Sequence, residues 1–250
     1  MNNVINIILQ GKGGVGKSLI ASLLAQYFSG KKLNLYCADT DPVNDTFARY
    51  KTLNVETIQI VDAANKIDTR AFDALVEHLT SHEGPAVIDN GASTFVPLTS
   101  YLIDSNIMEI FADANRDVVL HAVLTGGQAL QDTLVGLKAL LGTQKAPVVV
   151  WVNEYFGKVV AKDGSDFANS ELYKRYKDRI LGVVTIPQRS ADTYGKDMEL
   201  LVSNTLTFEQ AKTSDIFTFM PRSRLARVQK DIYDQIDALN LCEQPVALDA

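Results

Sequence analysis

A glycine-rich segment near the N-terminus constrains the fold more than any other feature of the chain. Residues 11–18 read Gly-Lys-Gly-Gly-Val-Gly-Lys-Ser and fit the pattern GxxxxGK[ST]. The apolar run 4–9 before them predicts a buried strand, and after Lys17 apolar residues recur with helical spacing as far as Gly30. A strand, a tight glycine turn and a helix in this order indicate an α/β protein with a parallel sheet.

Strands and helices alternate along the rest of the chain. The apolar runs predict strands at residues 33–38, 86–88, 107–111, 147–152 and 180–186. Helical spacing predicts helices at residues 71–79, 118–141, 171–179 and 221–239. Most of the strands are continuous apolar runs, which favours burial on both faces. We therefore expect a doubly wound, mainly parallel sheet with helices on both faces, formed as a single domain over residues 1–250 with a helical part from about residue 190.

Composition excludes several other classes of protein. The 250 residues are 46% apolar and 22% charged with a formal net charge of −6, which argues against extended disorder and against a generally basic protein that coats nucleic acid. Cys37 and Cys242 lie far apart and only three histidines are present, so neither a disulfide scaffold nor a Cys/His zinc site is expected. No apolar run approaches the roughly 20 residues of a membrane span. We expect a soluble, cytoplasmic protein.

The glycine-rich segment has the chemistry of a phosphate loop. Its residues are Gly11, Lys12, Gly13, Gly14, Val15, Gly16, Lys17 and Ser18. Glycines let successive backbone N–H groups converge on phosphate oxygens, and the N-terminus of the following helix adds its partial positive charge. Lys17 is placed to neutralise the β- and γ-phosphates, and the Ser18 hydroxyl to hold Mg²⁺.

A second lysine inside the loop narrows the class of phosphate-binding protein. The stretch from Lys12 to Ser18 resembles the deviant Walker A motif of the ParA/MinD family of ATPases. The resemblance implies a P-loop NTPase fold, ATP or ADP as the nucleotide and Mg²⁺ as its metal ion. It also implies an ATP-dependent homodimer in which Lys12 crosses the dimer face to the phosphates of the partner subunit. There it would act as a trans cation on the charge that develops during hydrolysis.

Two acidic segments resemble other parts of the family pattern. Asp39-Thr40-Asp41-Pro42 is similar to the first switch, which implies that Asp41 positions the attacking water and that Asp39 lies near the magnesium shell. The apolar run that ends at Asp89 is similar to a Walker B strand, which implies that Asp89 contacts magnesium-bound water. The chain departs from the family at Asn90-Gly91-Ala92, where one or two prolines usually follow the aspartate, and at Val43-Asn44-Asp45, where Gln-Gly-Asn is frequent. The resemblance thus makes Lys12, Lys17 and Asp41 the candidate catalytic residues, and Ser18, Asp39 and Asp89 the candidate metal ligands.

The ends of two later strands resemble the base-binding part of the family. Asn153 ends an apolar strand whose terminal asparagine reads adenine in the family, and Pro187 belongs to an Ile-Pro loop that packs on the base. An asparagine at a strand end more often serves as a cap, so this assignment depends on the phosphate loop.

Several motifs resemble one branch of the family, which conjugative plasmids encode and which is associated with transfer and plasmid maintenance. These are the phosphate loop with Leu9 and Gln10, the segment 39–44, the segment 88–93 and Thr125-Gly126-Gly127-Gln128-Ala129-Leu130. The branch implies a partner encoded by the plasmid, either an adaptor or a DNA-binding protein.

Two further partner classes can be judged from the C-terminal part. Some family members bind DNA non-specifically through basic residues, for which Arg222, Arg224 and Arg227 are candidates, although such a cluster is equally well explained as a solvated helix face. Others bind membranes through a basic amphipathic C-terminal helix. Here residues 241–250 are acidic and contain Pro245, so membrane targeting by that route is not expected.

Two functions from different classes remain open. In one, the protein is a dimerising switch driven by ATP hydrolysis that acts in conjugative transfer or in plasmid partition or positioning. In the other, it is a P-loop enzyme that phosphorylates or amidates a small molecule, as relatives with the same core do.

Overall fold

The computed structural model describes residues 3–62, 64, 66–160 and 164–241. Their centre is a seven-stranded sheet with the order β3-β2-β4-β1-β5-β6-β7, in which every neighbouring pair is parallel. The strands are β1 Val4–Leu9, β2 Tyr36–Asp39, β3 Glu56–Thr57, β4 Ala86–Asp89, β5 Asp117–Thr125, β6 Val148–Asn153 and β7 Ile180–Ile186. The sheet confirms the predicted fold class.

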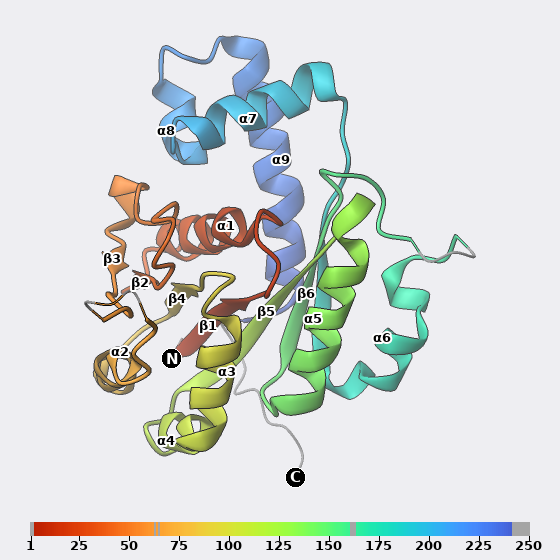
Figure 1. Ribbon diagram of the computed structural model, residues 1–250. Helices are drawn as coiled ribbons and strands as arrows, with labels where there is room; N and C mark the ends of the chain where they lie inside the picture. The colour runs from red at the N-terminus through yellow and green to blue at the C-terminus, as the bar shows by residue number, and fades with distance from the viewer. Residues whose placement is uncertain (1–2, 63, 65, 161–163, 242–250) are drawn as a thin grey trace.

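Helices cover both faces of the sheet (Figure 1). They are α1 Lys17–Gly30, α2 Ala71–Ser81, α3 Phe95–Asp104, α4 Ile107–Asp113, α5 Leu130–Thr143, α6 Glu171–Arg175, α7 Lys196–Ser203, α8 Phe208–Thr213 and α9 Phe219–Ala238. Short helical turns lie at Lys51–Leu53, Gly127–Ala129, Phe167–Asn169, Lys177–Arg179 and Ala191–Gly195.

Two apolar layers hold these helices on the sheet. On one face, Phe28 of α1 and Ile232 of α9 pack in the same core as Trp151 of β6. On the other face, Phe72 of α2 and Leu137 of α5 pack in a second core. The alternation of helices between the two faces is what a doubly wound sheet requires.

Two predicted elements in the middle of the chain are wrong. Residues 107–111, predicted as a strand, form helix α4, whose Ile107 and Phe111 lie on the same side one turn apart and are both buried. Residues 118–125, predicted as the start of a long helix, form strand β5. Because β5 lies between β1 and β6 and is buried on both faces, its sequence is a continuous apolar run, and such a run carries no strand periodicity.

The other predicted elements lie where expected, with shifted ends. The strand predicted at 33–38 is β2, Tyr36–Asp39, and the helix predicted at 171–179 is divided into α6 and the turn Lys177–Arg179. The long C-terminal helix is α9, which begins at Phe219. The sequence pattern does not predict β3 or α3, while α7 and α8 lie within the helical part expected from about residue 190.

A chain of buried polar side chains crosses the sheet on the face that α1 and α9 cover. Trp151 Nε1 donates to His121 Nδ1 at 2.9 Å, His121 Nε2 lies 2.9 Å from Asn6 Oδ1, and Asn6 Nδ2 donates to the Ala86 carbonyl at 3.1 Å. Since the indole only donates, His121 carries its proton on Nε2. These contacts join β6, β5, β1 and β4. Because Trp151, His121 and Asn6 satisfy one another's hydrogen bonds, they favour one strand register.

The C-terminal helix α9 covers the outer edge of β7. The side-chain amide of Gln235 accepts from the Thr185 N–H at 2.7 Å and donates to the Thr185 carbonyl at 3.0 Å, as a neighbouring strand would. Cys37 is buried, and burial raises the pKa of its thiol to about 12. Cys242 and the acidic residues 242–250 lie outside the described part of the chain. Among the described residues, no helix combines the length and the apolar character that a membrane crossing requires.

Candidate functional site

The predicted site residues gather at one edge of the sheet. Asp39, Asp89 and Asn153 are the last residues of β2, β4 and β6, and Gly11 follows the end of β1 by two residues. Because all the strands run the same way, their carboxyl ends meet at this edge, which is where open α/β sheets bind ligands.

The loop between β1 and α1 has the backbone geometry that a phosphate cradle needs. Gly14 and Gly16 have φ values of +73° and +102°, a left-handed conformation that favours glycine. At Gly16 the space is also closed, because a Cβ atom would lie 2.8 Å from Asn153 Nδ2. Helix α1 begins directly after Gly16 and has no acidic residue in its first turn. Its N–H groups and its positive end are therefore directed at the loop, and no acidic side chain of its own first turn competes for them.

Lys17 is a buried cation beside two carboxylates. Its side chain is 7% exposed, and Nζ donates to the Lys12 carbonyl at 3.2 Å. Burial lowers the pKa of this ammonium, and the charges of Asp89 and Asp41 act against that shift. Lys17, Asp89 and Asp41 are thus close enough to interact electrostatically, and their predicted roles at one phosphate site stay predictions.

Asp89 and Ser18 have the donor set of a magnesium site. The Ser18 side chain lies close enough to Asp89 to favour the charged form of this carboxyl, while Asp89 Oδ1 is buried and has no partner among the described residues. Burial raises the pKa of this carboxyl to about 7, with a smaller contribution from Asp39 in the same direction. A divalent cation at the free oxygen would stabilise the charged form. Mg²⁺ takes carboxylate, hydroxyl and phosphate oxygens, so these residues fit it.

The other predicted metal residue, Asp39, has a different environment. Its Oδ1 accepts from the Asp41 N–H at 3.0 Å, and its Oδ2 accepts from the N–H groups of Phe47 and Ala48, both at 3.1 Å. Both carboxylate oxygens thus hold the loop that follows β2. Asp39 thus holds this loop, and its place near a magnesium ion stays a prediction.

Asp41, the predicted water-positioning residue, lies at the start of that loop. Its Oδ1 accepts from the N–H groups of Val43 and Asn44 at 2.9 and 3.2 Å. Gly91, which follows the Walker B strand, approaches it so closely that a Cβ atom there would lie 2.8 Å from Asp41 Cγ. The segment after β2 and the segment after β4, called the two switch segments from here on, are therefore in direct contact.

Lys12 is paired with a residue that sequence reasoning missed. Its Nζ lies 2.9 Å from Asp132 Oδ2 in the first turn of α5, and both side chains are about half exposed. The sequence pattern placed Asp132 inside one long helix, and the glycines Gly126 and Gly127 were the only signal that a new helix begins nearby. In this chain the lysine predicted to act on a partner subunit is held by its own subunit.

Asn153 contacts the phosphate loop. Its Nδ2 donates to the Val15 carbonyl at 3.0 Å, and its Oδ1 accepts from the Tyr155 N–H at 3.2 Å. The end of β7 lies next to it, since Asn153 pairs with Ile186 and Pro187 follows at once. The structure therefore brings Asn153 and Pro187 to the same side of the loop, while both polar groups of the Asn153 amide already have partners. Adenine reading by Asn153 stays a prediction.

Glu154 is a second residue that the sequence did not indicate. It is nearly buried, and its Oε2 accepts from the Gln188 N–H at 3.2 Å and from Lys158 Nζ at 2.6 Å. Its backbone N–H donates to the Ile186 carbonyl at 3.0 Å. These contacts join the loops after β6 and β7 where a base is expected.

The three arginines of α9 have different surroundings. Arg222 donates to the Ser214 carbonyl at 2.9 Å, and Arg224 forms an ion pair with the nearly buried Asp197. Arg227 is exposed. Two of the three predicted DNA contacts thus have roles within the chain.

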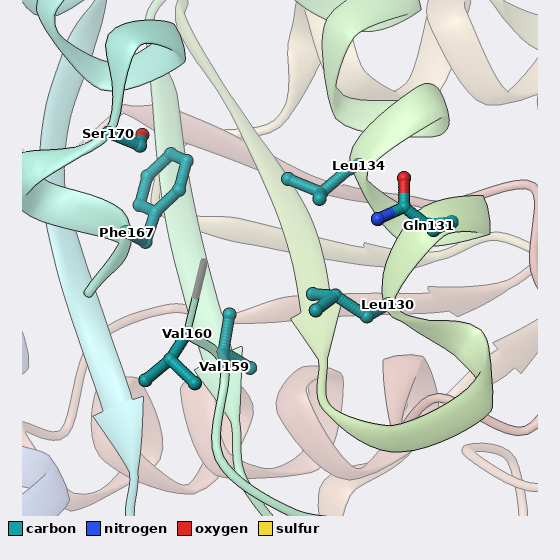
Figure 2. Close-up of a pocket in the computed structure, with 7 residues that line it drawn as sticks. All are labelled: Leu130, Gln131, Leu134, Val159, Val160, Phe167 and Ser170. Carbon is teal, nitrogen blue, oxygen red and sulfur yellow. The ribbon is translucent and has the colours of Figure 1, made fainter. Parts of the chain in front are cut away.

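A separate cavity of about 370 Å³ lies between α5 and the residues Val159, Val160, Phe167 and Ser170. Figure 2 shows Leu130 and Leu134 of α5 on one side of it, facing Phe167, Val159 and Val160 on the other. Its lining contains none of the predicted site residues, so it is not the phosphate site.

Comparison with solved structures supports the fold. The MinC:MinD cell division protein complex from Aquifex aeolicus aligns over 98% of this chain and 98% of the matched chain, with a TM-score of 0.53 and 13% identity. The MinD cell division protein from the same organism aligns over 98% and 99%, with a TM-score of 0.51 and 13% identity. At this level of identity the likeness concerns the fold alone.

Comparison of the sequences identifies the family. Two Escherichia coli proteins, each named protein TraL, are 43% identical to this chain over 235 and 237 residues, which is 93% and 94% of this chain and 97% of each of them. Residues 6–201 match the family CbiA, described as the CobQ/CobB/MinD/ParA nucleotide binding domain. The match includes the phosphate loop, both switch segments and the strand that ends at Asn153. The chain therefore belongs to the CobQ/CobB/MinD/ParA family of nucleotide-binding domains.

Proposed function

We propose that the protein is an ATPase that dimerises when it binds ATP and acts as a switch in conjugative transfer or in plasmid partition or positioning. One observation carries the nucleotide part of this proposal. Asp89 has a buried carboxylate oxygen without a partner among the described residues, and both Ser18 and the buried Lys17 lie close enough to this carboxylate to favour its charged form. The biological part is supported by the 43% identity to the proteins named TraL.

The residues of the site would divide the work as follows. The loop N–H groups and Lys17 bind the β- and γ-phosphates and neutralise their charge. Ser18 and Asp89 would hold Mg²⁺, which supplies further positive charge to the phosphates when bound. Asp41 would orient the attacking water, so it contributes to hydrolysis and not to binding.

Lys12 would complete the site of a second copy of the chain. In the single chain Lys12 is paired with Asp132, both at the surface, and such exposed pairs contribute at most about 1 kcal/mol. The phosphates of a bound nucleotide on a second subunit carry more charge than one aspartate and would compete for the lysine. Dimer formation would then exchange a contact within the subunit for one between subunits.

Substitution of the phosphate-binding lysine tests the nucleotide site. Lys17→Ala should abolish measurable binding of ATP and of ADP in isothermal titration calorimetry, because both nucleotides lose the same cation and its hydrogen bonds. Lys138→Ala, at an exposed lysine of α5, is the matched control and should bind as the unmodified protein does. Unchanged affinity in Lys17→Ala would refute the assignment of the loop.

Non-specific DNA binding through α9 is the finer part of the partner proposal. Because Arg224 holds Asp197 and Arg222 holds Ser214, Arg227→Glu is the variant that removes a surface cation without breaking an internal contact shown here. It should weaken the retention of DNA at low salt, and the triple variant of Arg222, Arg224 and Arg227 to Glu should abolish it. Lys138→Glu makes the same charge change elsewhere. Full DNA retention by the triple variant, with its ATP binding intact, would exclude α9.

A further inference from the structure

Three buried polar side chains from the segments that contain Asp41 and Asp89 form a hydrogen-bonded cluster. Thr40, Asn90 and Thr94 are each 0% exposed. Asn90 Oδ1 accepts from the Thr94 hydroxyl at 2.6 Å and from the Thr40 hydroxyl at 3.1 Å. Its Nδ2 donates to the Gly91 carbonyl at 3.1 Å. One amide oxygen is thus shared by two hydroxyl groups in the protein interior.

These contacts connect segments that lie far apart in the sequence. Thr40 stands between Asp39 and Asp41, directly after β2, while Asn90 directly follows Asp89 at the end of β4 and Thr94 precedes α3. Thr40 also donates to the Asp89 carbonyl through its N–H at 2.9 Å and through its hydroxyl at 3.1 Å. The backbone that carries Asp41 is therefore fastened to the backbone that carries Asp89.

A close approach of the two backbones accompanies these hydrogen bonds. A Cβ atom at Gly91 would lie 2.8 Å from Cγ, 2.9 Å from Oδ1 and 3.0 Å from Cα of Asp41. A residue with a side chain at position 91 would therefore displace Asp41 or the segment after β4. A displacement of either segment would move Asp41 relative to Asp89.

We propose that Asn90 is a positioning residue that joins the two switch segments, so that Asp41 and Asp89 keep one relative geometry. Its side chain is fully buried and acts through Thr40 and Thr94. The effect of Asn90 on the rate of hydrolysis rests on the proposed ATPase function. The structural consequence, that the segment 40–49 is held by a side chain of the segment 90–94, does not depend on hydrolysis.

The kinetic test uses valine, which removes a hydroxyl and keeps the volume of threonine. Asn90→Ala, Thr40→Val and Thr94→Val should each lower kcat about tenfold and leave the Kd for ADP within about twofold, because each removes at least one of the buried hydrogen bonds of the Asn90 side chain. In the Asn90→Ala background, either valine should lower kcat by clearly less than tenfold further, since the shared acceptor is gone and only the second acceptor of the hydroxyl, the carbonyl of Asp89 or of Gly91, remains to be lost. Thr99→Val, whose hydroxyl bonds only within α3, should keep kcat unchanged.

Two kinetic outcomes would overturn the proposal. One is a full effect of each valine in the Asn90→Ala background, which would mean that the threonines act independently of Asn90. The other is a loss of ADP affinity as large as the loss of kcat, which would indicate a general disturbance of the site.

Hydrogen exchange without nucleotide separates this inference from the proposed function. Asn90→Ala should increase amide exchange in residues 41–49 as well as in residues 90–98, and Thr99→Val should leave residues 41–49 unchanged. Faster exchange confined to residues 90–98 would overturn the link between the segments. If the unmodified protein hydrolysed no ATP, the proposed function would fail, and this measurement would still decide the role of Asn90.

Discussion

At the scale of single residues, Asn153 shows how a strand-end residue can be placed correctly and still have an unforeseen contact. The sequence predicts its position at the end of β6 and, through the family resemblance, a role in reading adenine. The structure shows that its amide holds the Val15 carbonyl and closes the space above Gly16. This contact depends on the distance between β6 and the phosphate loop, which no local pattern records.

This contact leads to a prediction about nucleotide affinity. Asn153→Ala should weaken ATP, ADP and GTP alike by about tenfold, because it releases the phosphate loop, which all three nucleotides need. Calorimetry on the three nucleotides measures this directly. A loss for ATP and ADP with none for GTP would instead assign Asn153 to the adenine base, and unchanged affinity for all three would contradict both roles.

The two aspartates at the ends of β2 and β4 show a limit of prediction at the same scale. Both follow short apolar strands, and the resemblance places both near magnesium. Asp39 differs because the chain returns at residues 47 and 48 and donates two N–H groups to it. No N–H group among the described residues reaches Asp89 Oδ1, which is buried without a partner there. The course of the loop 42–48 causes this difference between the two carboxylates, and the sequence does not reveal it.

At the scale of elements, the sequence predicts the strands with flanking turns and fails where burial removes periodicity. β1, β4, β6 and β7 are confirmed, because each is a short apolar run bounded by polar or glycine residues. β5 is buried on both faces, as β1, β4 and β6 are, but its apolar run leads within five residues into α5. The sequence pattern therefore predicts one long helix there. The identity of β5 follows from its place between β1 and β6, a long-range property.

The polar chain across the sheet leads to a prediction about pH. Burial lowers the pKa of His121 to about 3. The unfolded chain, with a pKa of about 6.5, therefore takes up a proton before the folded protein does as the pH falls, so stability decreases from about pH 6.5 towards pH 3. Between pH 7 and pH 5 this group should contribute a loss of about 2 kcal/mol.

Urea unfolding at the two pH values measures that loss. His121→Gln keeps a donor and an acceptor towards Asn6 and Trp151 but does not titrate, so it should lose about 2 kcal/mol less than the unmodified protein. His78→Gln, at an exposed histidine of α2, is the control and should lose as much as the unmodified protein. Equal losses in His121→Gln and the unmodified protein would contradict a buried, neutral His121.

Helix α5 leads to a prediction about assembly, because its first turn holds Lys12. Asp132→Asn should free Lys12 and favour the dimer with a non-hydrolysable ATP analogue by up to about thirtyfold in its dissociation constant, since each of the two exposed pairs of a dimer contributes at most about 1 kcal/mol. Sedimentation velocity at low salt measures the effect, which should disappear at high salt. Glu171→Gln, which breaks an exposed pair in α6, serves as control. A weaker dimer in Asp132→Asn would show that this carboxylate supports assembly.

At the scale of the whole molecule, the charges of α9 are explained largely by contacts within the chain. The helix begins with arginines and carries aspartates later, against the preference of its dipole. The later aspartates hold it to the rest of the protein, since Asp237 accepts from Tyr27 of α1 and from Lys31 directly after α1, and Asp231 pairs with Arg189. The reversed order therefore needs no anionic partner, and the case for DNA binding depends on the exposed Arg227.

The central claim is that two chains together form the hydrolytic site, with Lys12 acting on the nucleotide of the other subunit. The ATPase rate per molecule, measured over a wide range of protein concentration, tests it most directly. The account predicts a rate that rises with concentration and reaches a plateau, and a low rate without this rise in Lys12→Ala. A rate per molecule that is the same at every concentration would contradict the account and favour a P-loop enzyme that acts as a single chain.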